Sequence, residues 1–191
     1  MGTAHEFERE KLFCGVLYTD ENDYVRACER LRERFGAIDL ESDPLSFSAF
    51  SDYYGYEMTG EVYRRFVSFE VFAAPDTIAD IKTWTNEVEA DMSVDGKRRV
   101  NLDPGLIGHG RLLLPTTKPA GHRIALRDGI YIEMTLFYSR GGWHEFPWTY
   151  RDFKSEEVQG IMTQIRKKYI KTRRETMKNK NNTEADDVGT D

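Results

Sequence analysis

The chain has 191 residues, of which 39% are hydrophobic and 13% are aromatic. These values indicate one globular domain, and no apolar run approaches the roughly 20 residues that a membrane-spanning helix needs. The formal charge of −6 is unevenly placed, because the residues from Arg166 onward include eight basic and five acidic ones and the first 165 residues carry −9. An acidic body repels backbone phosphates, so we consider nucleic acid an unlikely partner.

The N-terminal stretch is charged and lacks the apolar core of a signal peptide. The two cysteines, Cys14 and Cys28, lie in a predicted strand and on the apolar face of a predicted helix, where they serve as reduced core residues. We therefore expect a cytoplasmic protein without a membrane anchor.

The first half of the chain alternates strand-like runs with amphipathic helices. One helix is predicted between Asp20, as its N-cap, and Gly36, as its C-cap, and a second begins at Pro75 and buries Trp84 in its apolar stripe. Residues 38–44 are predicted to be a loop. Strands are predicted over residues 11–19, 45–50, 64–72 and 98–103. The order βαββαβ is that of a ferredoxin-like α+β core.

The second half of the chain extends this core. Residues 104–114 combine Pro104, which suits a first helical turn, with several glycines, and we predict a short helix there. The dipeptide Asp128-Gly129 between two apolar segments predicts a β-hairpin. Ser155 is placed to cap a C-terminal helix.

The domain boundaries follow from where apolar periodicity begins and ends. Residues 1–10 have no such periodicity and are expected to be flexible. Residues 11–170 contain every predicted element and form a single α+β domain. Beyond residue 170 the sequence is polar and strongly charged, so residues 171–191 are predicted to be a disordered tail.

The segment TTKPAGHR, residues 116–123, gathers groups that bind anions in one bend of the chain. Its side chains can contact phosphate or carboxylate oxygens, and its imidazole can also move a proton. The alternative is an ordinary polar loop with a solvated lysine. The residues concerned are Thr116, Thr117, Lys118, His122 and Arg123.

Strand alternation places polar side chains in rows. Arg99, Asn101 and Asp103 share one face of their strand, and Glu70 and Glu133 lie on polar faces of two others. If these rows line one concave surface, the three carboxylates converge and can do acid–base chemistry or hold a divalent cation. The alternative, which is the more common arrangement, is that each row faces water. No histidine spacing predicts a zinc site, and the sequence names no cofactor beyond that cation.

Eight segments resemble a bacterial and archaeal family of small cytosolic proteins, the domain of unknown function 4416. The resemblance covers about residues 11 to 170 and implies no particular activity. The segments are KLFCGVLYTD, RFGAIDLESDPLSF, RRFVSFE, KTWTNEVE, RRVNLDPG, TTKPAGHR, LRDGIYIEMTL and WTYRDFKSEE.

We predict that the protein binds, and in one version of the hypothesis turns over, a small anionic metabolite that is phosphorylated or a nucleotide. The acid–base residues of this hypothesis are Asp103, Glu133 and His122. The residues expected to hold the ligand are Arg99, Asn101, Thr116, Thr117, Lys118 and Arg123. The alternative is a non-catalytic interaction module that contacts a protein or RNA partner through aromatic loops and the basic C-terminal helix.

Overall fold

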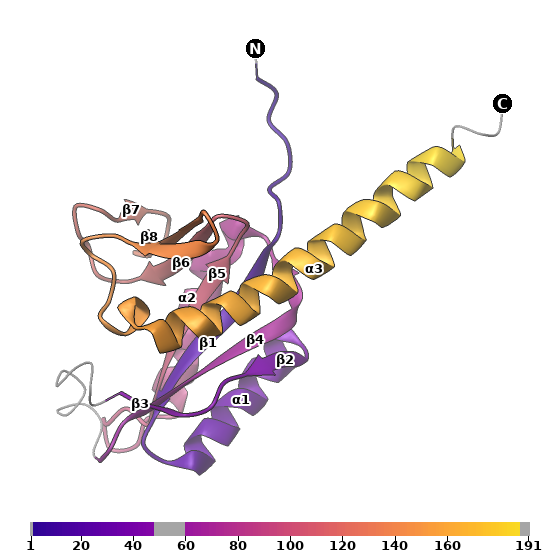
Figure 1. Cartoon of the computed structure of the whole chain (residues 1–191). Coiled ribbons are helices and arrows are strands. Elements are labelled where there is room, and N and C mark those ends of the chain that lie inside the picture. The colour runs from indigo at the N-terminus through magenta and orange to yellow at the C-terminus, as the bar shows by residue number, and fades with distance from the viewer. Residues whose placement is uncertain (1, 48–59, 188–191) are drawn as a thin grey trace.

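The computed structural model describes the backbone of residues 2–47 and 60–187 and the side chains as far as residue 176 (Figure 1). The helices are α1 (Glu21–Phe35), α2 (Ile78–Asp91) and α3 (Glu156–Asp187), with short 3-10 turns η2 (Pro75–Thr77) and η3 (Asp152–Lys154). The strands are β1 (Glu10–Tyr18), β2 (Ile38–Glu41), β3 (Leu45–Ser46), β4 (Tyr63–Ala73), β5 (Val100–Ile107), β6 (Arg111–Thr116), β7 (Ile124–Ala125), β8 (Tyr131–Ser139) and β9 (Gly142–Glu145).

The strands of the described segments form one antiparallel sheet, in which several neighbouring strands are not consecutive in the chain. The order across it is β2-β4-β1-β5-β6-β8-β7, with β3 paired to β4 and β9 paired to β8. The protein is therefore of the α+β class, as predicted. None of the helices in the described residues is long and apolar enough to cross a membrane.

Helices cover both faces of the sheet. One core cluster joins β1 and β5 to α1 and α2, and includes Leu31 and Val88. The other joins the opposite face of the sheet to α3, and includes Phe66 and Ile165. Figure 1 shows α3 crossing the sheet and then projecting beyond it.

Several predicted elements are confirmed together with the residues that begin and end them. Asp20 caps α1 by accepting a hydrogen bond from the Asn22 N–H at 2.8 Å, and Gly36 follows the helix with a φ of +83°. The predicted hairpin is the β7–β8 pair, and Asp128 and Gly129 both take the positive φ that its turn requires. Ser155 caps α3 through its hydroxyl.

Some predicted elements differ from the structure. Residues 38–41 are a strand, not a loop, because they pair with β4 and complete its edge. The strand predicted over 45–50 is seen as β3, and its last residues lie outside the described segments. Residues 142–145, for which no strand is predicted above, pair with β8 as β9. Helix α3 continues to Asp187, past the predicted domain end at residue 170, and the predicted disorder of residues 171–191 stays a prediction.

The predicted helix over 104–114 is wrong, because these residues form the end of β5, a turn and most of β6. Pairing of β5 with β1 along its whole length overrides the helical preference of Pro104. Gly105 is needed here because a Cβ at this position would lie 2.4 Å from the Phe13 ring.

Candidate functional site

Strands β5 and β6 separate at a pair of prolines. They pair at Ile107 with Leu112 and at Leu106 with Leu113, and no further. The N–H groups of the even-numbered residues of β5 point away from β1, as the bond from Leu102 to a helix side chain shows. The next hydrogen-bonded pair would therefore join Pro104 to Pro115, and neither residue has an N–H to donate. The sheet forks at this point.

Two side chains of α2 form hydrogen bonds with the backbone of β5 where β6 does not pair with it. The Lys82 ammonium donates to the Leu102 carbonyl at 2.8 Å, and Glu89 Oε1 accepts from the Leu102 N–H at 2.7 Å. Both side chains are buried. They take the hydrogen bonds that a neighbouring strand would have made, so the fork stays open without unpaired backbone groups on Leu102. Burial raises the pKa of Glu89, although Lys82, the Leu102 N–H and Arg98 act to lower it.

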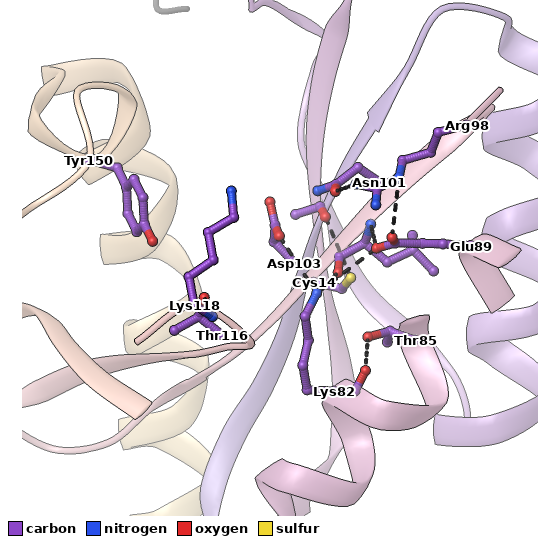
Figure 2. Close-up of polar contacts among 12 residues, drawn as sticks. Cys14, Lys82, Thr85, Glu89, Arg98, Asn101, Asp103, Thr116, Lys118 and Tyr150 are labelled. Carbon is purple, nitrogen blue, oxygen red and sulfur yellow. Dashed lines mark hydrogen bonds and ion pairs between the residues drawn. The ribbon is translucent and has the colours of Figure 1, made fainter. Parts of the chain in front are cut away.

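The fork opens into a cleft of about 1120 Å³. Its walls are the first half of β5, α2, the end of β6 and residues 150–153. Figure 2 shows Lys118 and Tyr150 on one side of Asp103, with Glu89, Arg98 and Asn101 on the other. The volume is slightly above the range of about 300–1,000 Å³ that is typical of small-ligand sites.

The cleft is basic in an acidic protein. Among the residues that the structure describes, its lining includes six basic and three acidic ones, a balance of +3, whereas the whole chain carries −6. The basic residues are Arg64, Lys82, Lys97, Arg98, Lys118 and Arg151, and the acidic ones are Glu89, Asp103 and Asp152.

Arg64 forms the inner wall of the cleft. Its guanidinium lies over the Phe47 ring at 4.8 Å, donates to Asp103 at 2.7 Å and also donates to Asp152. Arg64 and Asp152 are both buried, so each charge depends on the other for compensation. Asp103 is one-third exposed, and its second oxygen lies 3.9 Å from the Lys82 ammonium.

Two buried N–H donors on cleft-lining residues have no partner among the described residues. They are Nε of Arg64 and Nδ2 of Asn101. Asn101 is only 4% exposed, and its carbonyl oxygen accepts from the Arg98 guanidinium at 2.7 Å. A buried N–H donor without an acceptor is unfavourable. These two N–H groups could therefore each donate a hydrogen bond to an acceptor in the cleft.

The predicted site residues lie in three separate places in the structure. The first group lines the cleft and consists of Asn101, Asp103, Thr116, Thr117 and Lys118. His122, Arg123 and Glu133 form a second group behind it and do not line the cleft. Arg99 lies apart from both, with its Nε 2.9 Å from Asp23 Oδ2.

The second group is centred on Glu133, which is 2% exposed. Glu133 Oε2 accepts from Arg123 Nε at 2.8 Å and lies 3.2 Å from His122 Nε2. The His122 ring stacks on Trp148 with their centroids 4.8 Å apart. Glu133 therefore does not face water, and its carboxylate positions two side chains of the TTKPAGHR bend.

The predicted convergence of three carboxylates does not occur. Glu70 is exposed on β4, while Asp103 and Glu133 belong to the two different groups. Across residues 2–47 and 60–176, no three Asp, Glu, His or Cys side chains stand close enough together to hold a metal ion. Burial, with a further contribution from Asp103, raises the pKa of Cys14 well above its usual value, so this thiol is a core residue.

The chain matches the family described as domain of unknown function (DUF4416) over residues 8–169. The chain belongs to this family. No curated protein and no solved structure is detectably similar to it. The DUF4416 match spans β1 through Tyr169 of α3, and so contains every residue of the cleft.

Sequence reasoning missed several cleft residues of this DUF4416 protein. Lys82 and Glu89 are seven residues apart and directly follow Ile81 and Val88, which places both charges on the buried face of α2. Charged residues at core-facing helix positions are a usable signal of a polar site. Tyr150 and Arg151 gave no such signal, because only the tertiary structure brings residues 150–153 to the fork.

Proposed function

We propose that the cleft binds a small anionic ligand, of the class of phosphorylated metabolites or nucleotides. The observation that carries the proposal is the +3 balance of the described residues that line the cleft, within a chain of −6. A cleft with one sign of charge attracts ligands of the opposite sign, and its low-dielectric walls strengthen each contact. The acidic remainder of the surface repels the same ligands, which favours the cleft over non-specific sites.

The contacts available to such a ligand lie on both sides of Asp103. Lys118 and Thr116 can bind oxyanions at the end of β6, and Asn101 Nδ2 can donate from β5 after a small rotation. Of the three predicted acid–base residues, Asp103 alone lines the cleft. Any proton transfer on the bound ligand is therefore assigned to Asp103, beside the Arg64 and Lys82 cations.

We also propose that the core of the protein is ferredoxin-like. The strand order β2-β4-β1-β5 and the interleaved helices α1 and α2 support this assignment. The function does not depend on it, because folds of this kind serve many unrelated activities.

A thermal-shift screen tests the proposal. The protein is heated with inorganic phosphate, pyrophosphate, ATP and fructose bisphosphate, and separately with fructose, spermidine and magnesium ions. We expect the melting temperature to rise with at least one of the phosphorylated compounds and to stay unchanged with fructose and spermidine. Binding at a concentration 100 times Kd stabilises the folded state by about 2.7 kcal/mol, which is readily measured.

Two results would count against the proposal. A chain that none of the phosphorylated compounds stabilises has no anion site of useful affinity. A chain stabilised by spermidine instead would have a cation site elsewhere. Either result would leave an interaction module as the better account.

A further inference from the structure

Each of the three guanidinium nitrogens of Arg123 makes a contact within the protein. Its Nε donates to Glu133, its Nη1 donates to the Lys118 carbonyl at 2.8 Å, and its Nη2 contacts the Tyr150 hydroxyl at 2.9 Å. Its side chain is only 11% exposed. Arg123 thus joins the buried carboxylate to two residues that line the Lys118 end of the cleft.

The direction of the bond to Tyr150 follows from the chemistry of the two groups. A guanidinium has N–H donors and no acceptor, so the Tyr150 oxygen must accept from Arg123. The hydroxyl proton of Tyr150 is then directed elsewhere, and none of the described residues accepts it. Burial raises the pKa of Tyr150, as does the Glu133 charge, so the proton stays on the oxygen near neutral pH.

We propose that Tyr150 donates its hydroxyl proton in a hydrogen bond to the ligand's anionic group at the Lys118 end of the cleft, and that Arg123 is the positioning residue that orients it. This inference rests on the proposed function. It assigns Arg123, Glu133 and the TTKPAGHR bend a supporting role behind the site, in place of direct contact with the ligand. The ligand group is an oxyanion, since its oxygens accept from both the Tyr150 hydroxyl and the Lys118 ammonium.

The test is a double-mutant cycle measured by calorimetric titration. The probe is whichever of inorganic phosphate, pyrophosphate, ATP and fructose bisphosphate binds the wild-type chain most tightly. Tyr150→Phe removes the hydroxyl and keeps the ring, and Arg123→Lys keeps the charge but cannot reach three partners at once. Tyr131→Phe makes the same change on β8, outside the cleft, and serves as the control.

We expect Tyr150→Phe to weaken binding by about 10-fold or more, as the loss of a hydrogen bond to a charged group does, and Tyr131→Phe to change it by less than about 2-fold. Arg123→Lys should also weaken binding. Because Arg123 acts through Tyr150, the loss in the double variant should fall short of the product of the two single losses.

The outcomes separate this inference from the proposed function. If the wild-type chain binds none of the four probes, both fail. If the wild type binds a probe and Tyr150→Phe binds it equally well, the hydroxyl makes no contact and this inference alone fails. If the fold loss of affinity in the double variant equals the product of the two single losses, Tyr150 contacts the ligand independently of Arg123. The positioning role of Arg123 is then wrong. Melting temperatures of all variants verify that they fold.

Discussion

At the scale of single residues, Glu89 is an example of a carboxylate with a raised pKa. It lies on the core face of α2. Its Oε1 accepts from a backbone N–H of β5, and Lys82 and Arg98 lie 3.9 Å and 3.6 Å from its oxygens. A group whose pKa is raised on folding binds its proton more tightly in the native state. Its contribution to stability is therefore present at low pH and is lost as the pH rises through the folded pKa.

Glu89→Gln removes this dependence while keeping an oxygen that can accept from Leu102. We expect the free energy of unfolding of the variant to rise relative to that of the wild type as the pH increases from about 4 through the raised pKa. Above that pKa the difference between the two free energies should stay constant. Glu87→Gln, on the exposed side of the same helix, is the control for the amide substitution. Denaturant unfolding at a series of pH values measures the difference. A gain no larger than that of the control would show that Glu89 is not desolvated.

The residue pattern predicted which side chains share a strand face, but not what covers that face. Alternation along β5 put Asn101 and Asp103 on one face, and both line the cleft. The same reasoning set Glu133 beside them, but Glu133 is turned inward to Arg123. A polar row looks alike in a sequence whether it faces water, a cleft or a buried cation. The difference depends on which distant segment covers it.

At the scale of elements, the sequence predicts helices and hairpins from local signals, and fails where pairing decides. Asp20, Gly36 and the Asp128-Gly129 turn are local signals, and each is confirmed. Pro104 favours a helix start locally, yet it lies in a strand because β1 pairs with β5 over eight residues. That long-range pairing is invisible in the segment itself, as is the fork that Pro104 and Pro115 produce.

Helix α3 gives a prediction at this scale. Tyr169 is 1% exposed and packs on Phe72, whereas four of the five residues from Thr172 to Thr176 are exposed. A chain that ends at Thr176 should keep a melting temperature within about 2 °C of the full chain, because few buried contacts are lost. A chain that ends at Ile165 loses the Tyr169 contact, which should cost about 3–5 kcal/mol or roughly 10 °C.

Calorimetry of the two truncated chains measures both effects. The contact between Arg173 and Glu8 is an ion pair near the surface and should add less than about 1 kcal/mol. A large fall in the melting temperature of the chain that ends at Thr176 would mean that the projecting part of α3 stabilises the domain. The predicted domain end near residue 170 would then be too early.

At the scale of the whole molecule, the described part of the cleft and the whole chain have net charges of opposite sign. The chain carries −6, yet the described residues that line this cleft carry +3. The sheet fork explains how these charges meet, because it brings α2, β5, β6 and residues 150–153 to one opening. An anion that reaches the cleft is expected to bind with an affinity that falls steeply with salt.

The central claim is that a small anion binds in this cleft, and charge reversal at Lys118 tests it most directly. Lys171→Glu, on the exposed part of α3, changes the net charge of the chain equally but lies outside the cleft. Calorimetric titration with the tightest of the phosphorylated probes should show Lys118→Glu binding about 100-fold more weakly than the wild type, and Lys171→Glu within about 3-fold of it. Equal affinities for all three chains, or equal losses for the two variants, would contradict the account.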